Sequence, residues 1–340
     1  MDAPIELARA LLPVTAHVAV RVPASHPSTR MLGGERMGSA VVVDSTGLLL
    51  TVNYVVMGAR RLRVTLADGR RAPGEIVGQD FESGLALVRA RVSDVPAATL
   101  GFSESLERGA FVFAIAATGP RERHVAGGIV TDLGAFDAYW EYLLDRGIVS
   151  TAPNPGFGGG PLFDMRGRVV GVVSLNLSEI GRQSLAIPIE CFSRHRDELL
   201  RFGRVVSRPR RAWIGIFPHP VEEGLVVAGL VPEGPGERGG LKEGDVILRL
   251  DREDVDTRPA LYAALWRHQP GDHLVFEVVR DNRIHRVEIV GADRSEFYAS
   301  DGGRPDSAGT AGKYLVNGQI SPSATSLSTV GLNFPDFKSA

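Results

Sequence analysis

The first half of the chain consists of short apolar runs separated by glycine-rich turns, from about residue 14 to about residue 188. Representative runs are SAVVVDSTGLLLT, LALVRARV, GAFVFAIAA and RVVGVVSLNL, with turn chemistry such as Asp68-Gly69 between them. Strand-length segments of roughly four to eight residues, recurring about every dozen residues, are typical of a β-barrel or sandwich. The pattern shows no alternation of strands with helices, so we expect a mainly β fold.

The hydrophobic period changes at the end of this region. Over residues 190–202 apolar residues recur at helical spacing, with Phe192, Leu199 and Leu200 on one face, which predicts a helix. The stretch RVVSRPRRA that follows is polar and basic, as expected of a linker.

A second compact unit follows, from Trp213 to about Val290. Its strand-like segments are WIGIF, GLVVAGLV, DVILRLD, LVFEVVR and HRVEIV, and RPALYAALWRH predicts one helix. Beyond residue 292 the composition shifts to small and polar residues, which favours a flexible segment. We therefore predict a first domain over 1–203, a linker over 204–211, a second domain over 212–293 and a flexible tail over 294–340.

Composition is that of an ordinary soluble chain of two domains. It has 340 residues, 44% hydrophobic and 23% charged, with a formal net charge of −2. Nothing in this balance favours nucleic acid or an anionic membrane as partner, and no segment reaches the ~20 apolar residues that cross a bilayer. The single cysteine, Cys191, excludes an internal disulfide and a thiolate metal cluster, and its helical context favours a structural thiol. We predict no cofactor and no metal site.

Four segments resemble, in order, the HtrA (DegP-like) family of serine proteases. They are GSAVVVDSTGLLLTVNYVV, VTLADGRRAPGEIVGQDFESGLALVR, STAPNPGFGGGPLFDMRGRVVGVVS and SLAIPIE. A fifth, LLRFGRVVSRPRRAWIGI, leads into the second unit as the family's linker leads into its PDZ domain. The resemblance covers about residues 5–293. It implies a chymotrypsin/trypsin-like double β-barrel followed by one PDZ peptide-binding domain.

The catalytic positions of that family are altered in this chain. The ancestral reaction needs a hydroxyl nucleophile, an imidazole base and a carboxylate that orients the base. By the resemblance, the histidine position is Tyr54, the aspartate position is Gly84 and the serine position is Gly158. Glycine has no side chain to react, and tyrosine, with an ordinary pKa near 10, is a poor proton acceptor at neutral pH. We therefore predict a pseudoprotease without peptidase activity.

The loop at the old serine position gives two further expectations. Gly156, Phe157 and Gly158 are predicted to form a vestigial oxyanion loop, and the Phe157 ring is a candidate plug for the old pocket. The alternative function is a residual or unconventional serine-type endopeptidase, in which neighbours such as Ser83, Asp80 and Glu82 take over. None of the eight histidines lies in a triad motif.

The PDZ unit is predicted to be the working site. A PDZ domain adds an extended peptide to the edge of its sheet and holds the terminal carboxylate on backbone N–H groups of a loop. ERGGLKEGDVILRLD is the segment most similar to the family's PDZ domains. The alternative for the apolar members of the site is ordinary core. The predicted peptide-binding residues are Trp213, Ile214, Gly215, Ile216, Leu261 and Leu265.

The resemblance also bears on partners and location. Together with the altered catalytic positions, it leads us to expect a scaffold, adaptor or chaperone-like holder that binds protein C-termini or extended segments, and the family's habit of forming trimers makes a homotrimer possible. The chain's own end, LNFPDFKSA, is a further candidate for the groove. The N-terminal segment has Asp2 and Glu6 where a secretory signal would be basic. Although family members are often periplasmic, we expect a cytoplasmic location unless a targeting segment precedes residue 1.

Overall fold

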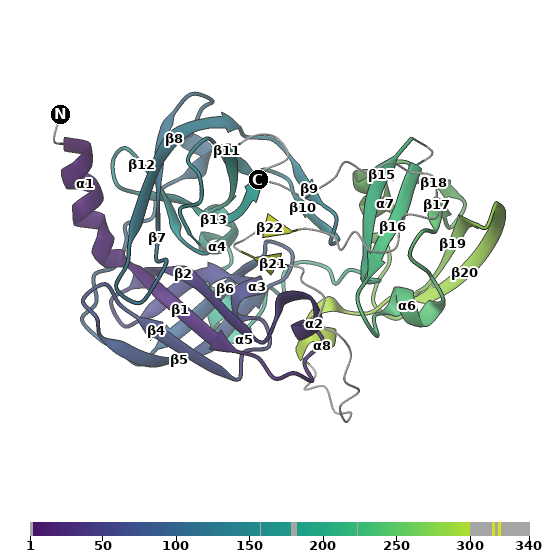
Figure 1. Ribbon diagram of the computed structural model, residues 1–340, viewed down its shortest axis with the longest axis horizontal. Helices are drawn as coiled ribbons and strands as arrows, with labels where there is room; N and C mark the ends of the chain where they lie inside the picture. The colour runs from purple at the N-terminus through teal and green to yellow at the C-terminus, as the bar shows by residue number, and fades with distance from the viewer. Residues whose placement is uncertain are drawn as a thin grey trace.

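The computed structural model describes residues 3–156, 158–177, 182–222, 224–299, 315–316 and 319–320 (Figure 1). These residues form two closed β-barrels packed side by side and a separate sheet with helices. The mainly β fold class predicted from the sequence is confirmed. No helix within these residues is long and apolar enough to cross a membrane.

The first barrel closes in the order β1-β2-β3-β6-β5-β4. Its strands are β1 (Thr15–Arg21), β2 (Glu35–Asp44), β3 (Leu48–Val52), β4 (Arg61–Thr65), β5 (Arg71–Asp80) and β6 (Leu85–Ala90). The run LLLTV of β3 is buried throughout, because this strand faces the barrel interior on one side and packed elements on the other. The helical segments around the barrel are α1 (Ala3–Leu11), η1 (Leu12–Val14), α2 (Thr29–Leu32) and α3 (Asn53–Val56).

The second barrel closes in the order β11-β14-β13-β12-β7-β8. Its strands are β7 (Phe111–Ala116), β8 (His124–Asp132), β11 (Ile148–Ser150), β12 (Pro161–Asp164), β13 (Val169–Leu177) and β14 (Gln183–Pro188), after η2 (Ser103–Ser105). Between β8 and β11 a two-stranded hairpin, β9 (Phe136–Ala138) and β10 (Tyr142–Leu144), leaves the barrel toward the sheet unit (Figure 1). One continuous cluster of buried apolar side chains joins the two barrels.

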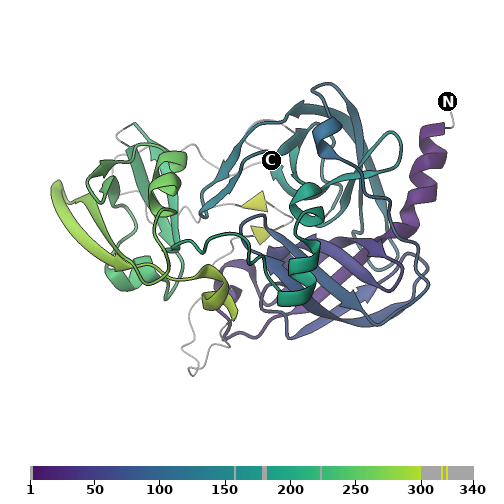
Figure 2. The same ribbon diagram turned by 180° about the vertical axis from the view of Figure 1, so that it is seen from behind.

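The helix predicted over residues 190–202 is present as two short helices, α4 (Glu190–Ser193) and α5 (Arg196–Phe202). Helix α5 is followed by Gly203, whose φ of +70° is a conformation that glycine adopts without strain. Figure 2 shows the chain leaving α5 and crossing to the sheet unit. Arg208 in this linker is held by both carboxylate oxygens of Asp80, each at 3.0 Å.

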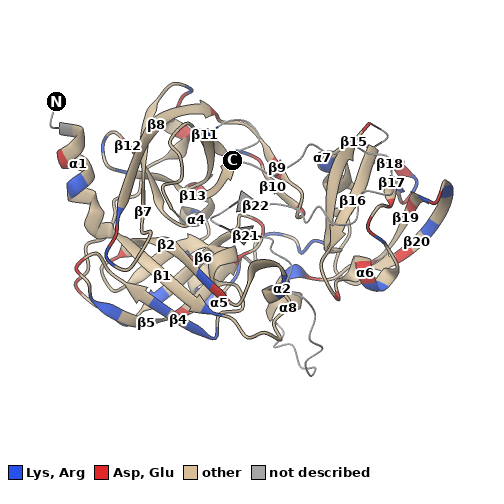
Figure 3. Ribbon diagram, in the orientation of Figure 1, with Lys and Arg blue, Asp and Glu red and all other residues tan. Residues whose placement is uncertain are grey.

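The third unit is a sheet in the order β15-β16-β17-β19-β20, with β15 at one edge. Its elements are β15 (Ile216–Val221), β16 (Gly224–Leu230), α6 (Pro235–Gly239), β17 (Val246–Leu250), β18 (Glu253–Asp254), α7 (Arg258–Leu265), β19 (His273–Arg280) and β20 (Arg283–Val290). Helix α7 begins after Thr257, whose hydroxyl accepts the N–H of Ala260 at 3.3 Å. Figure 3 shows charges of both signs spread over this unit and the barrels.

The start of the predicted flexible tail needs a correction, because residues 294–299 form a helix, α8 (Arg294–Ala299). Its Tyr298 is buried against Trp213 and Met57, so α8 packs between the sheet unit and the first barrel. The sequence does not reveal this helix, because α8 is only six residues long and its buried side chains pack on partners distant along the chain. Two short strands, β21 (Leu315–Val316) and β22 (Gln319–Ile320), pair with each other. The terminal segment LNFPDFKSA lies outside the described residues.

Candidate functional site

The predicted positions Tyr54 and Gly158 meet where the two barrels join. Tyr54 lies on α3 of the first barrel, and its hydroxyl donates a 2.7 Å hydrogen bond to the carbonyl oxygen of Ser174 on β13 of the second. A Cβ atom added at Gly158 would lie 2.0 Å from the Tyr54 hydroxyl oxygen and 2.8 Å from the Ser174 carbonyl oxygen. The tyrosine hydroxyl therefore occupies the space that a side chain at position 158 would need.

A second tyrosine covers Gly84. A Cβ atom at Gly84 would lie 3.3 Å from the ring of Tyr142, which comes from β10, and the backbone there has a φ of +80°. The Tyr142 hydroxyl donates to the carbonyl oxygen of Ser83 at 2.7 Å. Burial raises the pKa of both phenols, Tyr54 and Tyr142, well above the ordinary value of 10, so both remain protonated donors. Nothing in the sequence marked Tyr142, because its partner is a glycine distant along the chain.

The glycine loop before β12 is held by backbone contacts. The carbonyl oxygen of Gly158 accepts the N–H of Ser39 at 2.9 Å, and the N–H of Gly156 donates to the side-chain oxygen of Asn154 at 3.3 Å. A Cβ at Gly156 would lie 2.6 Å from the side chain of Thr118, so a larger residue there would displace that side chain. The candidate plug Phe157 lies outside the described residues.

The neighbours proposed to rescue catalysis are engaged in a structural network. The hydroxyl of Ser83 donates to Asp80 at 2.6 Å, and Asp80 in turn binds the guanidinium of Arg208. Glu82 is 3.6 Å from Arg208 and 3.4 Å from Arg211, and burial raises its pKa. These contacts tie the linker to the first barrel.

A serine and a histidine do meet elsewhere. His26 Nδ1 lies 2.7 Å from the hydroxyl of Ser28, and His26 Nε2 lies 2.9 Å from the carbonyl oxygen of Tyr298. Both side chains are buried, with Ser28 at 0% exposure, and the guanidinium of Arg36 also donates to the Ser28 hydroxyl. Because no substrate can reach this buried serine, Ser28 is not a nucleophile. The pair instead joins the first barrel to α8, through the contact of His26 with the Tyr298 carbonyl oxygen.

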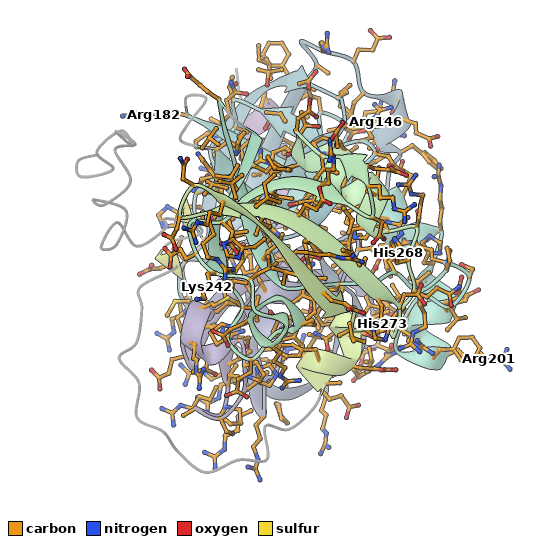
Figure 4. The ribbon with its side chains drawn as sticks, turned by 90° about the vertical axis from the view of Figure 1, so that its right-hand side faces the viewer. Arg146, Arg182, Arg201, Lys242, His268 and His273 are labelled. Carbon is orange, nitrogen blue, oxygen red and sulfur yellow. The ribbon has the colours of Figure 1, made fainter. Side chains whose placement is uncertain are left out.

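Cys191 is partly buried, and His268 and His273 each contact a carboxylate. Burial raises the pKa of Cys191 to about 12, which leaves its thiol protonated and poorly nucleophilic at neutral pH. His268 and His273, labelled in Figure 4, pair with Asp251 at 2.9 Å and with Glu288 at 2.8 Å. Within the part of the chain that the structure describes, no group of three or more histidine, cysteine or acidic residues could hold a metal ion.

The second site is a loop of backbone N–H groups at the start of the sheet unit. The N–H groups of Ile214, Gly215 and Ile216 point at one carboxylate, that of Glu141, at distances of 3.2, 2.6 and 3.0 Å. Gly215 has a φ of +75°, which lets consecutive N–H groups converge as in an anion-binding nest. Glu141 lies in the turn of the β9–β10 hairpin, so its carboxylate comes from the barrel part of the chain.

The side chains predicted to line the groove are buried. Ile214, Ile216, Leu261 and Leu265 are at most 1% exposed and share one apolar cluster with the strands of the sheet. Trp213 packs instead on Phe297 and Tyr298 of α8, with ring centroids 4.8 and 5.6 Å apart. The backbone N–H groups of residues 214–216 thus face Glu141, while the side chains of Ile214, Ile216, Leu261 and Leu265 belong to the apolar core of the sheet unit, as the alternative of ordinary core expects.

Glu141 is a residue of the candidate site that the sequence analysis did not single out. It is 4% exposed, and burial raises its pKa to about 7, against the opposing effects of the three N–H groups and of Arg294. The available signal was local: a single acidic residue in the aromatic string AYWEYLL. An acidic side chain buried among aromatic residues needs a polar partner, but this segment does not indicate which residue that partner is.

Paired barrels, followed by a sheet whose first loop presents N–H groups to a carboxylate, define a trypsin-like fold joined to a PDZ domain. The family description "Trypsin-like peptidase domain" matches residues 38–172, and "PDZ domain" matches residues 212–290. The chain is a homologue of the HtrA/DegP proteins, with a trypsin-like peptidase domain and one PDZ domain.

Curated relatives carry the name "Probable periplasmic serine endoprotease DegP-like". One from Halomonas elongata is 31% identical over 306 residues, which cover 83% of this chain and 63% of that protein. One from Pseudomonas fluorescens is 31% identical over 287 residues, covering 79% and 59%. The chain thus spans about 60% of the length of these relatives. The periplasmic location in these names contradicts the expected cytoplasmic location, which was wrong because it relied on the first residues of the chain alone.

Solved structures agree with the fold. The HtrA-type protease AlgW with a tripeptide is 26% identical, with a TM-score of 0.54, over 86% of this chain and 97% of that one. The same protease with a decapeptide has a TM-score of 0.52. A serine endoprotease from Yersinia pestis, at 22% identity and a TM-score of 0.51, supports the fold alone.

Proposed function

We propose that this chain is a catalytically inactive HtrA homologue that binds protein or peptide C-termini through its PDZ domain, as a scaffold, adaptor or chaperone-like holder. The observation that carries the proposal is the contact between positions 54 and 158. Gly158 has no side-chain atom that could act as a nucleophile. A Cβ atom added there would lie 2.0 Å from the Tyr54 hydroxyl oxygen, so the position also has no room for a side chain.

The chemistry of the neighbouring groups supports inactivity. Tyr54 keeps its proton because burial raises its pKa, and that proton is already donated to Ser174. It therefore acts neither as a base nor as a nucleophile. Gly84 supplies no carboxylate, and Tyr142 covers it. An oxyanion loop by itself contributes only about 10³–10⁴-fold over water, which is far below protease turnover.

The binding role rests on the three N–H groups of residues 214–216 and on β15, the edge strand beside them. A loop that already holds a carboxylate is chemically suited to a peptide C-terminus, and an edge strand can pair with the residues before it. The structures of AlgW with a tripeptide and with a decapeptide agree with a peptide ligand. By the names of its relatives, we place this function in the periplasm.

The decisive test combines two assays on the purified full chain. A fluorophosphonate probe is incubated with the protein, and labelling is read by mass spectrometry, while unfolded casein is followed for cleavage. We expect no labelled serine and no casein loss, with an active HtrA-type protease treated identically as the positive control. Labelling of one serine together with casein turnover would favour the alternative, the serine-type endopeptidase that the names of the relatives suggest.

The homotrimer implied by the family resemblance has a separate test. Light scattering at micromolar concentration should give about three times the chain mass of 36.5 kDa. A single-chain mass would remove the trimer from the proposal without affecting the peptide-binding role.

A further inference from the structure

The PDZ loop of this chain already holds a carboxylate that belongs to the chain itself. We propose that Glu141 is an internal ligand of the loop formed by residues 214–216, and that the C-terminal carboxylate of a partner must displace it to bind. This inference rests on the proposed peptide-binding function and adds its regulation.

The geometry at Glu141 is that of a bound C-terminus. Its Oε1 accepts the N–H groups of Gly215 and Ile216 at 2.6 and 3.0 Å, and its Oε2 accepts that of Ile214 at 3.2 Å. A peptide carboxylate would need these same three donors. The two ligands therefore exclude each other, since each N–H group supplies one hydrogen.

The turn that carries Glu141 also contacts helix α7. Tyr262 of α7 donates from its hydroxyl to the carbonyl oxygen of Ala138 at 2.6 Å and accepts the N–H of Glu141 at 3.1 Å. Arg258, also on α7, forms an ion pair with Asp137 at 2.6 Å. The hairpin thus lies against α7 while its carboxylate reaches the loop that precedes β15.

Further contacts place the turn over the edge strand. The ring of Tyr139 meets that of Phe217 on β15 edge-on, with centroids 6.0 Å apart. Arg294 of α8 donates to the carbonyl oxygen of Glu141 at 3.3 Å. Contacts to α7, β15 and α8 together hold the turn at the position that the last residues of a peptide would take.

The backbone conformation of Glu141 is a second, independent sign that the hairpin turn is held on the loop of residues 214–216. Its φ is +55°, a left-handed conformation that is strained for a residue with a side chain. The carboxylate is also 4% exposed. A strained backbone and a buried acid at one residue persist only where the surrounding contacts determine both.

The residue that follows Glu141 is Tyr142, which contacts the first barrel. Its ring covers Gly84, and its hydroxyl binds the Ser83 carbonyl oxygen. Glu141 at the PDZ loop and Tyr142 at the first barrel are therefore neighbouring residues of one hairpin.

The first measurement compares peptide affinity between the wild-type chain and Glu141→Gln. Probes are fluorescein-labelled hexapeptides that end in Ala, Val, Leu, Ile or Phe, each with a free carboxylate and as an amidated twin. Glutamine has one acceptor oxygen where Glu141 has two, so one of the three N–H groups loses its acceptor in this variant. The weaker internal ligand should let the carboxylate peptides bind about tenfold or more tightly, and the amidated twins should bind weakly to both proteins. Glu107→Gln, which changes an exposed glutamate in the second barrel, is the charge-matched control and should behave as wild type.

The second measurement needs no added ligand. Hydrogen exchange of the amides of residues 214–216 should be slow in the wild-type chain and at least about tenfold faster in Glu141→Gln. Circular dichroism of both proteins shows whether the variant is folded, and Glu141→Asn repeats the test with a side chain that tolerates the left-handed backbone.

The outcomes separate the two proposals. Tighter peptide binding together with faster exchange in Glu141→Gln supports the internal ligand. Equal, tight binding to both proteins overturns it and leaves the peptide-binding function intact. Faster exchange with no binding of any carboxylate peptide supports the internal ligand and contradicts the proposed function. Unchanged exchange in a folded Glu141→Gln variant overturns the internal ligand.

Discussion

The contact between Tyr54 and Gly158 makes a quantitative prediction about packing. Replacing Gly158 by alanine adds one Cβ atom at 2.0 Å from the Tyr54 hydroxyl oxygen, where ordinary contact begins at 3.4 Å. The backbone at Gly158 is not left-handed, so alanine is acceptable to the main chain and the cost is steric. Overpacking of a rigid junction costs about 3 kcal/mol.

A second substitution tests the cause. Tyr54→Phe removes the hydroxyl, so the nearest ring atom to the new Cβ becomes Cζ at 3.0 Å, while the Ser174 carbonyl oxygen stays at 2.8 Å. Tyr54→Phe alone loses its hydrogen bond and about 1 kcal/mol. In that background Gly158→Ala should cost only about 1–2 kcal/mol, because the backbone contact remains. The expected coupling energy is therefore about 1–2 kcal/mol.

Urea unfolding of the four proteins, followed by circular dichroism, measures this cycle. Gly127→Ala in β8 is the control, because an added Cβ there meets no atom within 4 Å. It should change the free energy of unfolding little and show no coupling to Tyr54. The reasoning is refuted if Gly158→Ala costs no more than Gly127→Ala, or if its cost is the same with phenylalanine at position 54.

Three further predictions concern the hairpin and the first barrel. Burial raises the pKa of Glu141 from 4.5 to about 7, so the docked carboxyl keeps a proton that the released one has lost. The charged and titratable groups around this carboxyl are Arg294, Tyr262 and the Arg258–Asp137 pair. Docking of Glu141 on the loop of residues 214–216 is therefore strongest below pH 4.5 and weakens as the pH rises through about 7. The affinity of the wild-type chain for a carboxylate peptide, measured by fluorescence polarisation, should therefore increase by about tenfold or more from pH 5 to pH 8. An affinity that does not change with pH, or an equal increase in Glu141→Gln, contradicts this prediction. Tyr262→Phe loses both contacts to the hairpin turn, worth about 1 kcal/mol each, and should tighten peptide binding several-fold in the wild type but not in Glu141→Gln. Arg36→Ala removes the donor to the carbonyl oxygens of Tyr54 and Met57 and should lower the free energy of unfolding by about 3 kcal/mol, whereas exposed Arg63→Ala should leave the urea midpoint unchanged.

The fold could be predicted from the sequence because its signals are local. Alternating apolar segments and turns such as Asp68-Gly69 set strand lengths, and the motif strings around Tyr54 and Gly158 placed them in a known order. The helix over residues 190–202 was predicted as one element but is divided at His195, since helix boundaries depend on caps and packing that periodicity does not encode.

The sequence by itself determined the residues at the predicted catalytic positions: no side chain at Gly84 or Gly158, and a phenol at Tyr54. Only the tertiary structure decided what fills those places and the PDZ loop. Tyr142 lies over Gly84, and Glu141 reaches N–H groups 73 to 75 residues further along the chain. Such contacts arise when separately folded elements pack together, and no local pattern of residues records which partner each will meet.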